Sequence, residues 1–144
     1  MTFEIRECRI DDAFDICEIN RNDLGYSFST NETVKNLSVI LQKESDKVFV
    51  AIADGKVAGY VHANIYELIY SPKRANIMGI AVSSGYRKQG IGKALISKVE
   101  AWAKENDAKG IRLVSGEHRK EAHCFYQGVG FIKSKTQFNF KKDI

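Results

Sequence analysis

The segment best suited to chemistry lies between Ile80 and Lys93, where an apolar run passes into a basic, glycine-bearing loop and then into a predicted helix. Glycines let an anion approach the backbone closely, and the unpaired amides and the dipole at a helix N-terminus attract negative charge. Arg87, Lys88 and Lys93 add positive charge at the same place. The pattern predicts a site for a phosphate-bearing ligand.

Two common phosphate-binding loops do not fit this segment. Gly85 and Gly90 have the spacing of a Walker loop, but Ile91-Gly92 follows where that loop requires Lys and then Ser or Thr. A dinucleotide fingerprint beginning at Gly90 would need glycine at position 95, which is Leu95. Neither ATP nor NAD is therefore indicated, and an ordinary exposed basic turn is the alternative interpretation.

The elements that must position this loop follow from the periodicity of apolar residues and from turn signals. Strands are predicted at residues 2–7, 48–53, 57–65, 77–82 and 111–114, with two more at residues 131–132 and 137–140. Helices are predicted at residues 11–20 with Asp11 as cap, 29–43 with a Ser29-x-x-Glu32 capping box, 90–105 and 122–129. Asp54-Gly55 predicts a hairpin turn. The order of these elements indicates a mixed α/β sheet.

Composition places these elements in one domain that spans residues 1–144. The chain has 22 Lys and Arg against 18 Asp and Glu, and 44% of its residues are hydrophobic. No apolar run approaches the roughly 20 residues of a membrane span, and the N-terminus shows no signal-peptide pattern. We therefore expect a cytoplasmic protein without membrane attachment. Cys8, Cys17 and Cys124 lack the spacing of a zinc site, so we expect reduced thiols and no metal.

Two motifs resemble those of the GCN5-related N-acetyltransferases (GNAT family). Arg87-x-x-Gly90-x-Gly92, after an apolar strand, resembles their pyrophosphate-binding motif A. Ala122-His123-x-Phe125-Tyr126-x-x-x-Gly130-Phe131 resembles their motif B, and the likeness covers essentially the whole chain. It implies the GNAT acyl-CoA N-acyltransferase fold, with a central, mostly antiparallel sheet, a splayed parallel strand pair and four flanking helices. Residues 1–144 would form a single N-acetyltransferase domain.

The resemblance also implies where acetyl-CoA binds. The backbone of the central strand would pair with the pantetheine arm, and loop amides would hold the pyrophosphate. The thioester would lie where strands 77–82 and 111–114 splay apart, with the Ile80 amide as candidate donor to a developing oxyanion. The implied cofactor-binding residues are Ile80, Ala81, Val82, Arg87, Lys88, Gln89, Gly90, Ile91, Gly92 and Lys93.

Tyr126 matches the family position whose phenol protonates the departing CoA thiolate, so the resemblance implies that it is the general acid. The alternative is that Tyr126 packs with Phe125 and Val129 as part of a core. An amine would attack the thioester directly in a ternary complex, without a cysteine nucleophile.

The general base is not assigned by the resemblance. Many relatives carry an acidic residue at the position of Gly79, and the strand around Gly79 offers no proton acceptor. Glu67 and Glu117 are candidates, with solvated surface carboxylates as the alternative interpretation. His62 has no evident partner in the sequence, and the spacing of the other histidines does not predict a metal site.

The acceptor is predicted only as a primary amine. Its contacts are expected from Tyr26, between the first two helices, and from Tyr66 and Glu67 near the end of a hairpin strand. The missing acidic residue leaves a catalytically weak acyl-CoA-binding sensor as one alternative. A nucleic-acid-binding module is a weaker one, because acidic residues are interleaved with the basic ones. The predicted strand around Phe138 and Phe140 has two interpretations. It is either an edge strand that pairs with a second subunit in a homodimer, or a core strand that is fully covered.

Overall fold

The computed structural model describes residues 2–144. The chain divides into two compact units, of which the first ends at Leu113 and the second is Val114–Ile144. In residues 2–144 the strands are β1 (Glu4–Glu7), β2 (Asp46–Ala53), β3 (Lys56–Leu68), β4 (Ser71–Val82) and β5 (Ile111–Leu113). The helices there are α1 (Ala13–Asp23), α2 (Thr30–Ile40), α3 (Ile91–Glu105) and α4 (Lys120–Gly128). None of the described helices has the length and apolar character needed to cross a membrane.

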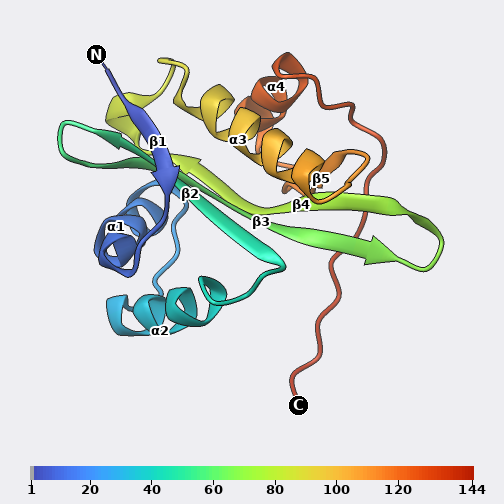
Figure 1. Ribbon diagram of the computed structural model, residues 1–144, viewed down its shortest axis with the longest axis horizontal. Helices are drawn as coiled ribbons and strands as arrows, with labels where there is room; N and C mark the ends of the chain where they lie inside the picture. The colour runs from blue at the N-terminus through green and yellow to red at the C-terminus, as the bar shows by residue number, and fades with distance from the viewer. Residues whose placement is uncertain (1) are drawn as a thin grey trace. The chain divides into compact units, whose positions relative to one another are not determined.

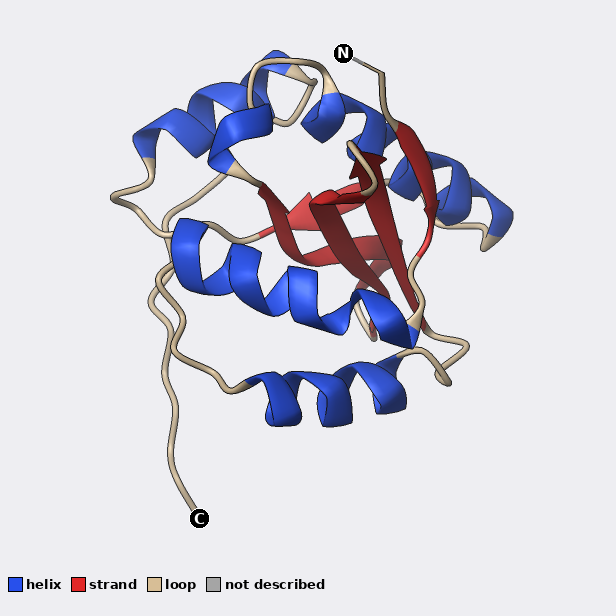
Figure 2. Cartoon of the chain, turned by 90° about the vertical axis from the view of Figure 1, so that its left-hand side faces the viewer, coloured by secondary structure: helices blue, strands red, loops and turns tan. Residues whose placement is uncertain are grey.

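The sheet of the first unit has the strand order β1-β2-β3-β4-β5 (Figures 1 and 2). Its first four strands are antiparallel, and β4 and β5 form a parallel pair that extends only from Ala75 to Ile77 on β4. The predicted Asp54-Gly55 turn joins β2 to β3, with φ of 53° and 74°, as the common two-residue hairpin turn requires. The expected mixed sheet with a short parallel pair is confirmed.

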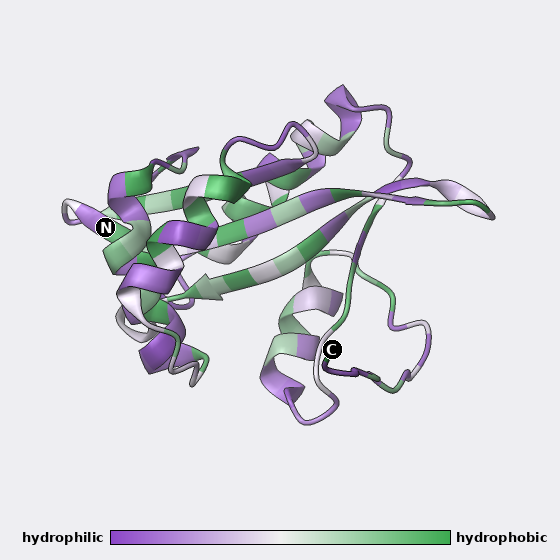
Figure 3. Cartoon of the chain, turned by 90° about the horizontal axis from the view of Figure 1, so that it is seen from below, coloured by the Kyte–Doolittle hydropathy of each residue, from purple (hydrophilic) through white to green (hydrophobic). Residues whose placement is uncertain are grey.

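Helices cover both faces of this sheet. Successive residues of β3 point to opposite faces, so neighbouring residues meet different helices. The Tyr60 hydroxyl hydrogen-bonds the Asn20 side chain of α1. A Cβ atom at the preceding residue, Gly59, would lie 3.2 Å from Ile91 of α3. Figure 1 shows the result, with α1 and α2 on one side of the sheet and α3 on the other. The apolar and polar colours that alternate along the strands in Figure 3 follow the same period.

The N-terminal ends of the first two helices differ in how well they were predicted. Helix α1 follows a 3₁₀ turn, Ile10–Asp12, so the expected cap at Asp11 is wrong. Asp12 is the buried residue there, and its carboxylate accepts hydrogen bonds from Arg6 at 2.8 and 2.9 Å and from the Arg9 amide at 2.8 Å. Before α2, the Ser29 hydroxyl accepts the Glu32 amide at 3.1 Å, which is one of the two hydrogen bonds of the predicted capping box.

The second unit contains α4 and an extended C-terminal segment. The two predicted terminal strands, at residues 131–132 and 137–140, are wrong, since no strand is assigned after Leu113 in the part of the chain that is described. The Phe131 amide instead donates to the Tyr126 carbonyl at 2.9 Å, which closes the end of α4. The side chains of Phe138 and Phe140 are 86% and 90% exposed. Alternating apolar and polar residues are not enough for a strand, because a strand must also pair with a neighbouring strand.

Candidate functional site

A β-bulge at Met78 interrupts the pairing of β3 with β4 in the first unit. His62 of β3 pairs with Gly79, and the next residue, Ala63, pairs with Ile77, so Met78 has no partner on β3. Bulges of this kind re-aim side chains and are common beside active sites. The pairing of β4 with β5 also stops at Ile77. Residues 78–82 therefore have β3 on one side and, among residues 2–144, no strand on the other, which leaves backbone amides and carbonyls to pair with an extended ligand.

The loop after β4 presents further unpaired amides. The first hydrogen bond of α3 runs from the Ala94 amide to the Gly90 carbonyl at 3.0 Å. The amides of Ile91, Gly92 and Lys93 therefore precede the first intrahelical bond and have no partner within the helix. Gly90 has φ of 88°, and a Cβ atom there would meet nothing within 4 Å. Three free amides and a helix dipole suit a phosphate group.

Arg87 plays a different part from the one its charge suggests. Its guanidinium lies 3.3 Å from the Asp23 carboxylate at the end of α1, and its Nε donates to the Val82 carbonyl at 3.1 Å. The same Asp23 oxygen accepts the Ser84 amide at 3.1 Å. Arg87 therefore fixes the course of the loop. Lys88 adopts φ of 61°. Lys88 and Lys93 are both exposed, so their charges remain available to an anion.

The loop is anchored a second time through Tyr86. Its hydroxyl donates to the Asp54 carboxylate at 2.9 Å, and the Lys56 ammonium lies 5.6 Å from the centre of its ring. Asp54 belongs to the turn between β2 and β3. Neither Asp23 nor Tyr86 was singled out in the sequence, because their partners are 64 and 32 residues away along the chain.

The face of the sheet toward α1 and α2 carries polar groups next to the bulge. The Tyr60 hydroxyl lies 3.7 Å from the position that a Cβ atom at Gly79 would occupy. Burial raises the pKa of Tyr60 to about 12, so the phenol stays protonated. His62, two residues along the strand, has its Nε2 at 2.7 Å from the Asp46 carboxylate. The expectation that His62 lacks a partner is therefore wrong.

Tyr60 and His62 line a cavity of about 180 Å³ between the helices α1 and α2 and the strands β2 and β3. Its apolar lining comes from both helices and from the segment between them. The other lining residues are Ile16, Asn20, Phe28, Thr33, Asn36, Leu37, Ile40 and Val48. The cavity is thus mainly apolar with a few convergent polar groups, as small-molecule sites are.

Of the residues expected to contact the acceptor, Tyr66 and Glu67 lie away from the bulge, whereas Tyr26 is close enough to Tyr60 to contribute to its raised pKa. Tyr66 pairs with Arg74 far along the β3–β4 hairpin, and the Arg112 guanidinium lies 4.3 Å from the centre of its ring. With a strand rise of about 3.3 Å per residue, Tyr66 is about 13 Å from His62 and Glu67 about 16 Å. Tyr26, on the segment between α1 and α2, is 60% exposed.

Within the second unit, Tyr126 packs edge-to-face against two aromatic rings. Its ring centre is 5.6 Å from that of Phe125 and 5.9 Å from that of Phe131. Burial raises the pKa of Tyr126, and the positive charge of Arg119 opposes this without cancelling it. The phenol therefore stays protonated at neutral pH, as a proton donor must be. The His123 ring lies 2.9 Å from the Gly116 carbonyl, which fixes its position in the same unit.

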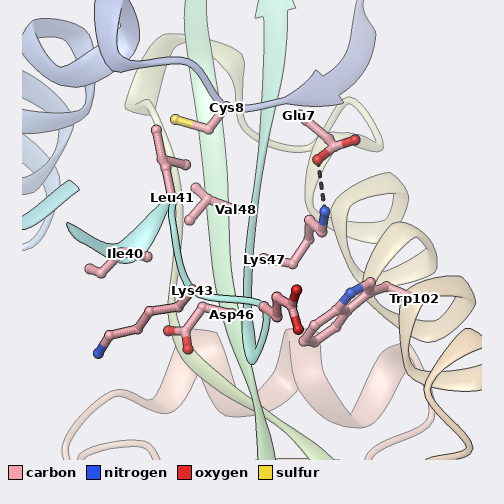
Figure 4. A pocket seen from close by; sticks show the side chains of 10 residues that line it. Glu7, Cys8, Ile40, Leu41, Lys43, Asp46, Lys47, Val48 and Trp102 are labelled. Atoms are coloured by element: carbon pink, nitrogen blue, oxygen red, sulfur yellow. Dashed lines mark hydrogen bonds and ion pairs between the residues drawn. The ribbon is translucent and has the colours of Figure 1, made fainter. Parts of the chain in front are cut away.

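A second cavity, of about 330 Å³, lies in the first unit between the strands β1 and β2, the end of α2 and Trp102 of α3 (Figure 4). Its charged lining residues have both signs, and Lys47 pairs with Glu7 at 2.8 Å. The thiol of Cys8 lines it, and burial raises the pKa of that thiol to about 12. Cys8 is therefore not a nucleophile at neutral pH. Among residues 2–144 no group of three or more potential metal ligands is clustered.

Comparisons with known proteins agree with this geometry. The model of the acetyltransferase (GNAT) family matches residues 13–131. An N-alpha-acetyltransferase of Sulfurisphaera tokodaii is 29% identical over 150 residues, which cover 98% of this chain and 87% of that protein.

Solved structures show the same fold. A transcriptional regulator from Bacillus halodurans superposes with a TM-score of 0.88 at 23% identity, covering 98% of this chain and 100% of the other. AAC(6')-Iy in complex with the bisubstrate analogue CoA-S-monomethyl-acetylneamine superposes with a TM-score of 0.87 at 20% identity, covering 100% of both chains.

Proposed function

Because the chain belongs to the acetyltransferase (GNAT) family and is an acetyl-CoA-dependent acyltransferase, we propose that it acetylates a primary amine. The amine attacks the thioester carbonyl directly, with both substrates bound together. The observation that carries this proposal is the open edge of β4, which begins at Met78 and leads into the loop before α3.

The loop before α3 and the open edge of β4 suit different parts of acetyl-CoA. The free amides of Ile91, Gly92 and Lys93 suit the pyrophosphate, while the backbone of Ile80, Ala81 and Val82 can pair with the amide-bearing pantetheine arm. The thioester then falls near the bulge. There the Ile80 amide is the proposed donor to the oxyanion that forms as the amine attacks.

Tyr126 is the proposed general acid, which protonates the sulfur of CoA as the carbon–sulfur bond breaks. Support comes from its place in motif B and from a pKa raised by burial, which keeps its proton available. The assignment rests on the motif and on the state of the phenol within the second unit. We also propose that residues 1–144 form one N-acetyltransferase domain.

The class of acceptor is proposed from two relatives. The matched relative from Sulfurisphaera is an N-alpha-acetyltransferase, and AAC(6')-Iy is an aminoglycoside N-acetyltransferase. Both act on primary amines, so we test an α-amino group and an aminoglycoside amine. Tyr26 would contact the acceptor at the segment between α1 and α2, and Tyr66 and Glu67 would reach only a long acceptor.

The experiment measures thiol release from acetyl-CoA with neamine, and separately with a short peptide that has a free N-terminus. Mass spectrometry of each acceptor then shows whether it has been acetylated. Acetylation of either acceptor above the rate without enzyme supports the proposal. Tight acetyl-CoA binding without acetylation of any amine in a wider panel would instead identify an acyl-CoA sensor.

A further inference from the structure

We propose that His62, held by Asp46, accepts the proton that the acceptor ammonium must lose before it can attack. The proposal rests on the proposed amine acetylation and assigns the base which that reaction needs. It starts from an observation about position: the strand residue that faces His62 is Gly79, which carries no side chain.

His62 lies on the same face of the sheet as a side chain at Gly79 would. The two residues are directly opposite on antiparallel strands, so their side-chain positions share one face of the sheet, about 5 Å apart. Tyr60 is two residues from His62 and shares that face, and its hydroxyl is 3.7 Å from the Cβ position of Gly79. The imidazole therefore stands beside the bulge, on the wall of the 180 Å³ cavity.

Asp46 sets the tautomer of the imidazole. One of its carboxylate oxygens lies 2.7 Å from His62 Nε2, and the other accepts the Ser45 hydroxyl at 2.8 Å. A carboxylate accepts hydrogen bonds, so Nε2 carries the hydrogen and Nδ1 carries the lone pair. The side chains of His62 and Asp46 are only 18% and 11% exposed, which limits competition from water. Asp46 is thus a positioning residue, and it also stabilises the imidazolium once formed.

The ammonium gives one proton to His62 Nδ1, directly or through one water, and the freed lone pair forms the carbon–nitrogen bond at the thioester carbonyl. The carbon–sulfur bond then breaks, and its electron pair leaves on the sulfur of CoA. The nitrogen loses a second proton, which balances the one that the sulfur gains by way of Tyr126. His62 returns its proton to solvent.

The surroundings of His62 offer no better base. The helices α1 and α2 contribute Asn20, Thr33 and Asn36 to the cavity, and none of these titrates near neutral pH. The titratable groups nearest the imidazole are Asp46 of β2 and Tyr60 of its own strand, with Tyr26 close to Tyr60. Lys43, Glu44 and Lys47 line the other cavity together with Asp46. Tyr60 has a pKa of about 12 and stays protonated. Glu67 lies about 16 Å along β3.

The test compares wild type with His62→Gln and Asp46→Asn, using whichever of neamine and the free-N-terminus peptide the wild type acetylates. Glu7→Gln is the matched control, because it breaks the exposed pair with Lys47 at the neighbouring strand end. Steady-state rates are measured from neutral pH to the pH at which the amine is mostly unprotonated. Acetyl-CoA affinity and melting temperature show whether each variant is folded.

We expect His62→Gln to lower kcat about 10²-fold at neutral pH, with acetyl-CoA affinity unchanged. The loss shrinks as pH rises, because a free amine needs no base. Asp46→Asn gives a smaller loss in kcat with the same pH signature and little change in KM, and Glu7→Gln resembles wild type.

A folded His62→Gln variant with wild-type kcat, or with a loss that is constant across pH, would overturn the assignment of His62. An Asp46→Asn variant with unchanged kcat would overturn the role of Asp46. Failure of the wild type to acetylate any amine would instead overturn the proposed function.

Discussion

Asp23, at the end of α1, holds Arg87, which lies 64 residues further along the chain in the loop before α3. One carboxylate oxygen of Asp23 receives both the Arg87 guanidinium and the Ser84 amide. The helix on one face of the sheet thereby fixes the loop that leads to the helix on the other face. Arg87 thus holds the loop of the proposed phosphate site, and Lys88 and Lys93 are exposed there.

Asp23→Asn should weaken acetyl-CoA binding about threefold to tenfold, because the loop loses one charge-assisted hydrogen bond worth about 1 kcal/mol or slightly more. Isothermal titration calorimetry measures the change. Glu18→Gln is the control, since it breaks an exposed pair with Arg21 on the same helix. Equal affinities for Asp23→Asn and wild type would show that the loop keeps its course without Asp23.

Gly90→Ala should also weaken acetyl-CoA binding, by about tenfold. Gly90 has φ of 88°, a conformation that costs a residue with a Cβ atom about 1–2 kcal/mol. Gly85→Ala in the same loop is the control, because its φ is not in the left-handed region and a Cβ atom there meets nothing within 4 Å. If both variants bind acetyl-CoA equally well, the conformation of Gly90 does not shape the site.

Tyr126→Phe should lower kcat about 10²-fold and leave acetyl-CoA affinity unchanged, because it removes only the proton that the thiolate needs. The phenyl ring of the variant can still pack against Phe125 and Phe131. Tyr70→Phe, at an exposed position of the first unit, is the control. A Tyr126→Phe variant that turns over at the wild-type rate would leave Tyr126 with a packing role.

Gly79→Glu should restore part of the activity that His62→Gln loses, by at least about tenfold. The backbone there is ordinary strand, and a Cβ atom would make normal van der Waals contact with the Tyr60 hydroxyl at 3.7 Å. The new carboxylate would stand where many GNAT relatives carry theirs. The readout is kcat of the double variant against His62→Gln, and no recovery would show that position 79 does not face the amine.

Asp12→Asn should lower the free energy of unfolding by about 2 kcal/mol at pH 7, since hydrogen bonds to charged groups contribute about that much. Burial by itself would raise the pKa of Asp12, but the hydrogen bonds from Arg6 and the Arg9 amide outweigh it and lower the pKa below 3.8. The stabilisation is therefore complete above about pH 5 and is lost as pH falls through the lowered pKa. Urea unfolding at a series of pH values from 7 downward tests this, because the difference between the two proteins should be constant above about pH 5 and shrink as the pH falls below 3.8.

The sequence was sufficient for the strand, loop and helix around Gly90, because apolar periodicity, the Asp54-Gly55 turn and the free helix N-terminus are local properties. It was not sufficient for the bulge at Met78 or for the Asp46–His62 pair, which depend on strand register and cross-strand contact. The terminal strands were predicted wrongly for a related reason. The alternation of apolar and polar residues around Phe138 and Phe140 is typical of a strand, but no strand in residues 2–144 pairs with this segment. A homodimer through that segment stays a prediction.

The central claim is that acetyl-CoA lies along the open edge of β4 with its pyrophosphate at the start of α3. Backbone amide hydrogen exchange with and without acetyl-CoA tests it most directly. We expect slower exchange within residues 78–82 and at Ile91, Gly92 and Lys93, with Ile69 and Tyr70 at the hairpin tip unchanged. Protection centred on the cavity beside Cys8 and Trp102, with none at β4 or α3, would contradict it.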